Sequence, residues 1–156
     1  MLYFAYGSNM DWSQMRERCP SARFVCVAKL KDHRLAFTRK SEKRGCGVSD
    51  VIPDLGHDVW GIVYEIDLRD LGRLDKCEGF VPGRPREENA YFREERHVYR
   101  DGNDDAPLVA LVYFAIQQNN PPQPNAEYKR LIVDGARNWH LPEDYIRELE
   151  QIEAAP

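Results

Sequence analysis

The chain has 156 residues, of which 42% are hydrophobic and 31% charged, and its formal net charge is -4. This length and balance are typical of one compact domain, so residues 1–156 are expected to fold as a single unit. The acidic balance gives no reason to expect a nucleic-acid partner, because phosphate binding needs concentrated Lys and Arg. One basic stretch, Arg34–Arg44, is interrupted by Glu42 and is interpreted as a solvated hairpin loop.

The four cysteines carry no metal-binding pattern, since they contain no CxxC pair and no histidine lies at a zinc-ligand spacing. They are Cys19, Cys26, Cys46 and Cys77. Met1 leads directly into a strand-like segment rather than a charged signal sequence, and the apolar run Leu108–Ile116 is too short to cross a bilayer. We therefore predict a cytoplasmic protein with reduced thiols, no bound metal and no membrane partner.

The N-terminal segment predicts a strand, a tight turn and a short helix. Leu2–Tyr6 is aromatic and apolar, as in a buried strand, and it ends at the turn formers Gly7–Asn9. Asp11 followed by Gln14 resembles a capping box, and Cys19-Pro20 marks the end of the helix. A glycine-containing turn before a helix presents free backbone N–H groups, which suit a carboxylate or an oxyanion.

The middle of the chain predicts a β meander. Its four strand-like runs are Phe24–Leu30, His33–Thr38, Gly45–Ile52 and Val59–Ile66. Within the last run, Gly61 is expected to let another backbone or a ligand approach closely. Further on, Tyr91–Tyr99 and Leu108–Ile116 predict a β-hairpin around Asp101–Asn103.

Three helices are predicted after the first. Asp67 is expected to cap Leu68–Cys77, which ends at Gly79. Apolar spacing over Tyr128–Trp139 predicts the second, and Pro142 fits the first position of the third. The elements together predict an α+β fold, with a mixed curved sheet or small β-barrel and surrounding helices.

Glu78 lies where a helix ends and the chain must turn. A glutamate in this position is most often solvated, but the turn can direct its carboxylate inward at a pocket. Burial would then raise its pKa, as a general base or acid near neutral pH requires. Ser8 lacks the GxSxG elbow and a spaced His and Asp set, and Cys77 is interpreted as a small buried packing residue.

Taken together, these segments resemble the γ-glutamylcyclotransferases over nearly the whole chain. Tyr3–Met10 is similar to the family's N-terminal YGSN signature, Val59–Tyr64 to its VWG strand, and Leu74–Gly79 to the segment with its catalytic glutamate. Downstream, the pairs that recur in the family's order are Pro121-Pro122, Tyr128-Lys129, Gly135-Ala136 and Leu141-Pro142.

The resemblance implies an enzyme that converts a γ-glutamyl amino acid or amide to 5-oxoproline and releases the amine, with no cofactor and no metal. It implies that Glu78 is the catalytic residue that transfers the proton. It further implies that the substrate-binding residues are Tyr3, Phe4, Ala5, Tyr6, Gly7, Ser8, Tyr91 and Tyr128.

Several alternatives stay open at this point. A γ-glutamylamine cyclotransferase would differ at the pocket mouth, to which the polar, exposed insertion Val81–Asn89 is expected to contribute. A glutathione-specific cyclotransferase is less favoured, because those relatives show a different central pattern. A non-catalytic binding module is opposed by Glu78, since a binder of an acidic γ-glutamyl group gains nothing from a nearby carboxylate. The only expected partner is the small-molecule substrate, and the protein is expected to be a monomer or homodimer.

Overall fold

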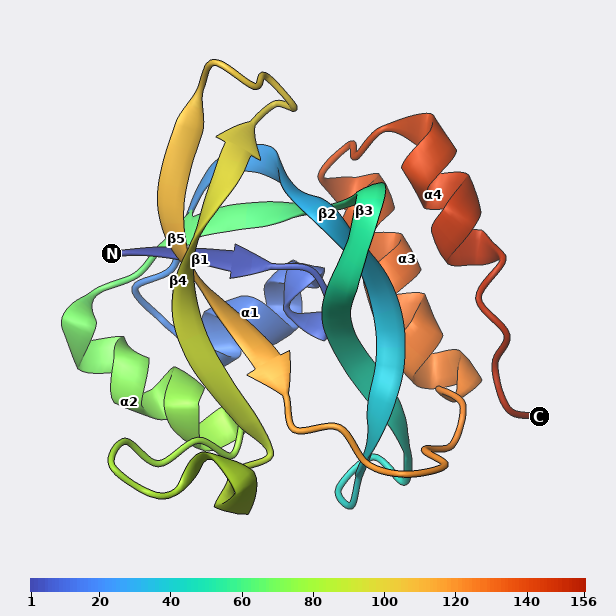
Figure 1. Ribbon diagram of the computed structural model, residues 1–156. Coiled ribbons are helices and arrows are strands. Elements are labelled where there is room, and N and C mark those ends of the chain that lie inside the picture. The colour runs from blue at the N-terminus through green and yellow to red at the C-terminus, as the bar shows by residue number, and fades with distance from the viewer.

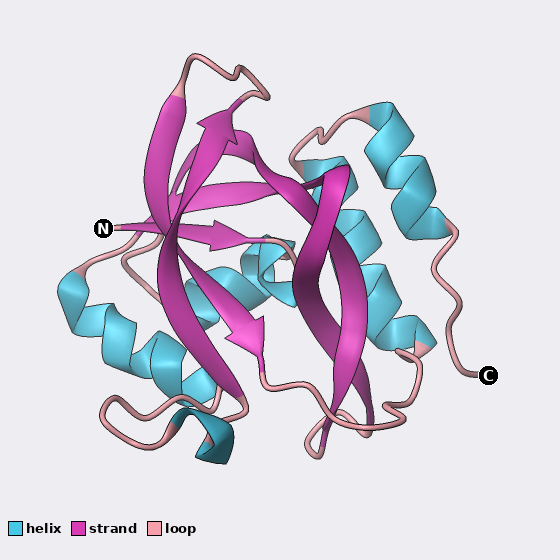
Figure 2. Ribbon diagram, viewed as in Figure 1, coloured by secondary structure: helices cyan, strands magenta, loops and turns pink.

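The computed structural model, which describes residues 1–156, is a closed five-stranded barrel with helices packed around it (Figures 1 and 2). The strand order is β1-β3-β2-β4-β5. The strands are β1 (Leu2–Ala5), β2 (Arg23–Ser41), β3 (Cys46–Glu65), β4 (Tyr91–Arg100) and β5 (Pro107–Ala115). The α-helices are α1 (Trp12–Arg18), α2 (Leu68–Cys77), α3 (Ala126–Asn138) and α4 (Glu143–Glu150). The predicted α+β fold, in its form as a small β-barrel, is confirmed.

The predicted four-strand meander is wrong, because its runs join into two long strands. β2 and β3 pair antiparallel from Arg23↔Glu65 to Ser41↔Cys46, with the longest interruption at residues 54–57, and form one hairpin. The breaks that the sequence shows at Asp32 and at Pro53–Gly56 are bends inside these strands, where the pairing register shifts. The two bends face each other, since the Gly56 amide donates a 2.9 Å hydrogen bond to Asp32 Oδ1.

The predicted helices are present, with small differences at their ends. Asp11 caps α1, because its Oδ2 accepts a 2.9 Å hydrogen bond from the Gln14 amide. Asp67 occupies the N-cap of α2 but makes no side-chain capping bond there. Pro142 lies at the N-cap of α4, one position earlier than predicted. None of the helices is both long and apolar enough to cross a membrane.

The predicted β4–β5 hairpin is confirmed, with pairs running from Tyr91↔Ala115 to Tyr99↔Pro107. In the barrel, β5 lies beside β1 and closes the sheet. α3 and α4 lie side by side next to the β2–β3 hairpin, while α2 lies on the other side of the barrel (Figure 1). This arrangement leaves the C-terminal end of β1 between the helices.

β1 is a strand of the barrel wall and packs closely against β3. A Cβ on Gly61 of β3 would lie 2.3 Å from the carbonyl oxygen of Ala5 and 2.9 Å from the ring of Phe4. The close backbone approach predicted for Gly61 is therefore confirmed, and a larger residue there has no room. After Ala5 the chain passes through Tyr6 and Gly7 into a short 3-10 turn, Ser8–Met10, and then into α1.

Candidate active site

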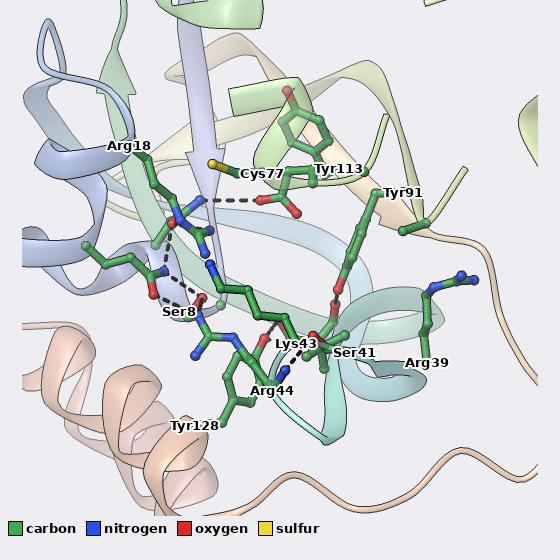
Figure 3. Close-up of a pocket in the computed structure, with 18 of the residues that line it drawn as sticks. Ser8, Arg18, Arg39, Ser41, Lys43, Arg44, Cys77, Tyr91, Tyr113 and Tyr128 are labelled. Carbon is green, nitrogen blue, oxygen red and sulfur yellow. Dashed lines mark hydrogen bonds between the residues drawn. The ribbon is translucent and has the colours of Figure 1, made fainter. Parts of the chain in front are cut away.

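A cavity of about 1180 Å³ opens at the end of β1 (Figure 3). Segments that are far apart in the sequence line it, among them the turn after β1, α1, the end of the β2–β3 hairpin, the C-terminal end of α2, the start of β4 and the start of α3. No group of three or more His, Cys, Asp or Glu side chains in the protein is arranged to hold a metal ion.

Most of the predicted site residues meet at this cavity. The ones that line it are Tyr3, Tyr6, Gly7, Ser8, Glu78, Tyr91 and Tyr128. Phe4 and Ala5 do not, and their expected place in the site is corrected. Successive side chains of a strand point to opposite faces, so the Phe4 ring packs against Gly61 while Tyr3 faces the cavity. Ala5 is 1% exposed and lies in the sheet opposite Ile62.

Glu78 ends α2 and presents a half-buried carboxylate to the cavity. Its Oε1 lies 3.4 Å from Nδ2 of Asn9. Burial raises the pKa of Glu78 to about 7; the cations Arg18 and Arg44 oppose the rise, and the Asp75 charge adds to it. A carboxyl with this pKa exchanges a proton readily near neutral pH.

Asn9 fixes the position of the Glu78 carboxylate from the turn after β1. Its Nδ2 also donates to the Tyr3 hydroxyl at 3.0 Å, and its Oδ1 accepts from Gln14 at 2.9 Å and from Arg18 at 3.1 Å. Because both ends of the amide are bonded, its orientation is set. Sequence reasoning assigned no role to Asn9, although it belongs to the turn motif.

Ser49 of β3 lies beneath the glycine turn and is held by two tyrosines. The Tyr128 hydroxyl lies 2.9 Å from Ser49 Oγ and accepts from its amide at 3.0 Å, and the Tyr91 hydroxyl donates to its carbonyl at 2.6 Å. Burial raises the pKa of both tyrosines, which keeps them neutral. Above Ser49, the backbone N–H groups of Gly7 and Ser8 make no hydrogen bond within the protein.

The basic end of the β2–β3 hairpin is exposed at Lys40, Glu42 and Lys43, as predicted for a solvated hairpin loop, and it also forms one wall of the cavity. Residues 39–44 all line the cavity. Arg44 reaches α1, where it donates to Gln14 Oε1 at 2.7 Å, and its guanidinium lies 4.9 Å from the ring centre of Tyr128. In all, seven Arg and Lys side chains line the cavity against four Glu. The cations are Arg18, Arg39, Lys40, Lys43, Arg44, Arg73 and Lys76.

The insertion Val81–Asn89 lies outside the cavity lining, so the prediction that it forms the mouth is wrong. Asn89 folds the insertion back on itself, because its Oδ1 accepts from the Val81 amide at 3.1 Å and from Arg84 Nε at 2.8 Å. Shortening this loop is therefore not expected to change the leaving amine that is preferred. Cys77, interpreted as buried, is exposed and lines the cavity.

The model of the AIG2-like family matches residues 58–149, which is more than half of the chain, so the chain is an AIG2-like protein. The mouse protein named Gamma-glutamylcyclotransferase is 33% identical over 157 residues, which are 97% of this chain and 78% of that protein. The human protein of the same name is 31% identical, again over 97% of this chain and 78% of that protein. A solved structure named Gamma-glutamyl cyclotransferase matches with a TM-score of 0.87 and 30% identity, over 99% of this chain and 89% of its own. The chain therefore belongs to the gamma-glutamylcyclotransferase family.

Proposed function

We propose that the protein cyclises the γ-glutamyl group of a small molecule to 5-oxoproline and releases the amine. The observation that carries this proposal is Glu78, whose half-buried carboxylate has a pKa of about 7 and shares a cavity with the free amides of Gly7 and Ser8. The relatives named gamma-glutamylcyclotransferase support the same reaction.

The reaction requires few catalytic groups from the protein, because the substrate carries its own nucleophile. The α-amine attacks the γ-carbonyl carbon, a new C–N bond closes the five-membered ring, and the bond to the leaving nitrogen breaks. Holding the two ends of the γ-glutamyl group together can supply roughly 7–11 kcal/mol of the barrier through orientation alone.

Glu78 performs both proton transfers in this proposal. Its carboxylate takes a proton from the attacking amine and returns it to the leaving nitrogen, so the side chain ends each turnover as it began. Asn9 holds the carboxylate in place, while the Gly7 and Ser8 amides bind an anionic group of the substrate beside Arg18 and Arg44.

The alternatives receive less support. A γ-glutamylamine cyclotransferase would use the same proton transfer, but the curated relatives that match most of the chain carry the name gamma-glutamylcyclotransferase. A pure binding module leaves Glu78 unexplained, because a carboxylate beside an anionic ligand weakens binding.

The direct test is to incubate the purified protein, in buffer with EDTA, with γ-glutamyl amino acids, γ-glutamyl-lysine amides and glutathione, and to measure 5-oxoproline. We expect release from the γ-glutamyl amino acids without any added cofactor. No 5-oxoproline from any member of the panel would overturn the proposed function. Loss of activity on chelation, with recovery on adding a divalent metal, would contradict the metal-free mechanism.

The pH dependence should follow the titration of Glu78. Since the proposal requires its carboxylate form, kcat/KM should fall as the pH drops through about 7, the pKa of Glu78. Arg18 lowers this pKa, so Arg18→Gln should move the midpoint to higher pH. The matched control is Arg130→Gln, which removes an exposed cation that does not line the cavity. If the pH midpoint of kcat/KM is the same for Arg18→Gln as for the control, the assignment of this titration to Glu78 is contradicted.

A further inference from the structure

The cations of the cavity have no carboxylate partners. The chain has 22 Arg and Lys residues, and seven of them line the cavity. None of these seven forms a salt bridge, whereas ten of the other fifteen do. In a chain with a net charge of -4, carboxylates are available to pair with cations. The cavity is therefore the place where positive charge is left uncompensated.

The uncompensated charge is concentrated near the turn after β1. In Figure 3 the side chains of Arg18, Lys43 and Arg44 converge on the region of Ser8. Arg18 donates to an amide oxygen of Asn9, and Arg44 donates to the side-chain oxygen of Gln14, so both bonds are to neutral groups. The Lys43 side chain, on the exposed turn, makes no hydrogen bond. Like charges held this close repel one another until an anion binds between them.

The cations extend well beyond the place that the proposed function gives to the γ-glutamyl group. Lys40 lies at the end of β2 and Lys43 on the β2–β3 turn, while Arg73 and Lys76 lie on α2. Neither pair is needed to bind one carboxylate at the Gly7 and Ser8 amides. The cavity, about 1180 Å³, is also larger than the range of roughly 300–1,000 Å³ that is typical of ligand pockets, so it has room for a second charged group.

We infer that the leaving amine of the preferred substrate carries two carboxylates, as in glutamate, aspartate or a short γ-linked glutamate peptide. This inference rests on the proposed function, and it names the part of the substrate that the basic wall recognises. The γ-glutamyl end lies at the glycine turn, and the acidic leaving group lies between the β2–β3 turn and α2. A leaving amine of the same size without the second carboxylate would lose the ion pair with the β2–β3 turn and the ion pair with α2.

The test compares γ-glutamyl-glutamate with γ-glutamyl-glutamine, which have nearly the same shape and differ by one charge. We expect kcat/KM for γ-glutamyl-glutamate to be about fivefold or more higher, mainly through KM, because two partly exposed ion pairs give effects of this size. The preference should shrink as the salt concentration rises from about 0.05 M to about 0.5 M, because salt screens exposed charges.

The variant Lys40→Gln/Lys43→Gln removes two cations from the wall. Both side chains are exposed and make no hydrogen bond, so the fold should be unaffected. The matched control is Arg100→Gln/Arg130→Gln, which changes the net charge equally at exposed positions outside the cavity. The ratio of kcat/KM for γ-glutamyl-glutamate to kcat/KM for γ-glutamyl-glutamine should fall toward one in the wall variant. It should stay unchanged in the control.

A binding measurement separates failure of this inference from failure of the proposed function. Calorimetry of both dipeptides on a Glu78→Gln protein reports affinity without requiring turnover. If neither dipeptide yields 5-oxoproline with the unmodified protein, the proposed function fails, and the affinity ratio still decides the inference. Equal affinities and equal kcat/KM values, or a wall variant that behaves like the control, would overturn it.

Discussion

Glu78→Gln is expected to reduce the rate of 5-oxoproline release by about a thousandfold or more while substrate binding is kept. Acid–base help from one side chain is worth roughly a hundred- to ten-thousandfold, and here both proton transfers depend on the same carboxylate. The amide fills nearly the same volume, and its oxygen can still accept the hydrogen bond from Asn9. Binding should hold or tighten, because a negative charge beside an anionic substrate is removed.

The measurement is 5-oxoproline release, with calorimetric affinity and a melting curve, for the wild type and Glu78→Gln. Glu87→Gln is the matched control, since Glu87 is exposed on the insertion and does not line the cavity. A folded Glu78→Gln protein that works within about tenfold of the wild-type rate would remove Glu78 from the mechanism, because that loss amounts to only about 1.4 kcal/mol of transition-state stabilisation.

Gly7→Val is expected to abolish substrate binding and to lower stability. A Cβ on Gly7 would lie 2.2 Å from Ser49 Oγ, and Ser49 is held in place by Tyr128 and Tyr91. The turn must therefore shift away from Ser49, which moves the Gly7 and Ser8 amides that face the cavity. Overpacking of this kind typically costs about 1–3 kcal/mol of stability, so affinity must be compared in folded protein.

Three further variants make this prediction specific. Gly72→Val is the control, because nothing lies within 4 Å of a Cβ on Gly72 in α2. Gly7→Ala should bind weakly, and adding Ser49→Ala should recover part of the affinity, since it removes the oxygen with the shortest contact. If folded Gly7→Val shows unchanged affinity, the turn has only a structural role.

The parts of the fold and site that the sequence predicted correctly depend on neighbouring residues. The strand, turn and helix around Gly7 follow from a buried apolar run, turn formers and an N-cap at Asp11. The position of Glu78 between the end of α2 and the turn at Gly79 is likewise visible over a few residues, whereas its catalytic role was implied by the family resemblance alone.

The parts that could not be predicted depend on contacts between distant segments. The bends at Asp32 and Pro53–Gly56 carry the same residues as true chain reversals, and only the pairing of β2 with β3 shows that the strands continue. Likewise, no local pattern shows that residues 39–44 turn back over the cavity. Phe4 was predicted to bind substrate together with its neighbours in β1, although side chains alternate along a strand and its ring therefore points to the opposite face.

The proposed catalytic residue and the basic wall of the cavity are on separate pieces of the chain. Glu78 ends α2, whereas residues 39–44 cover the end of β2 and the turn to β3, and the strand pairing continues up to Ser41↔Cys46. A turn between two paired strands can change in sequence without altering the barrel beneath it. On the proposed specificity, exchanging this turn alone should change the amine that is released while the proposed proton transfer at Glu78 is kept, which makes the turn a direct target for engineering a new substrate preference.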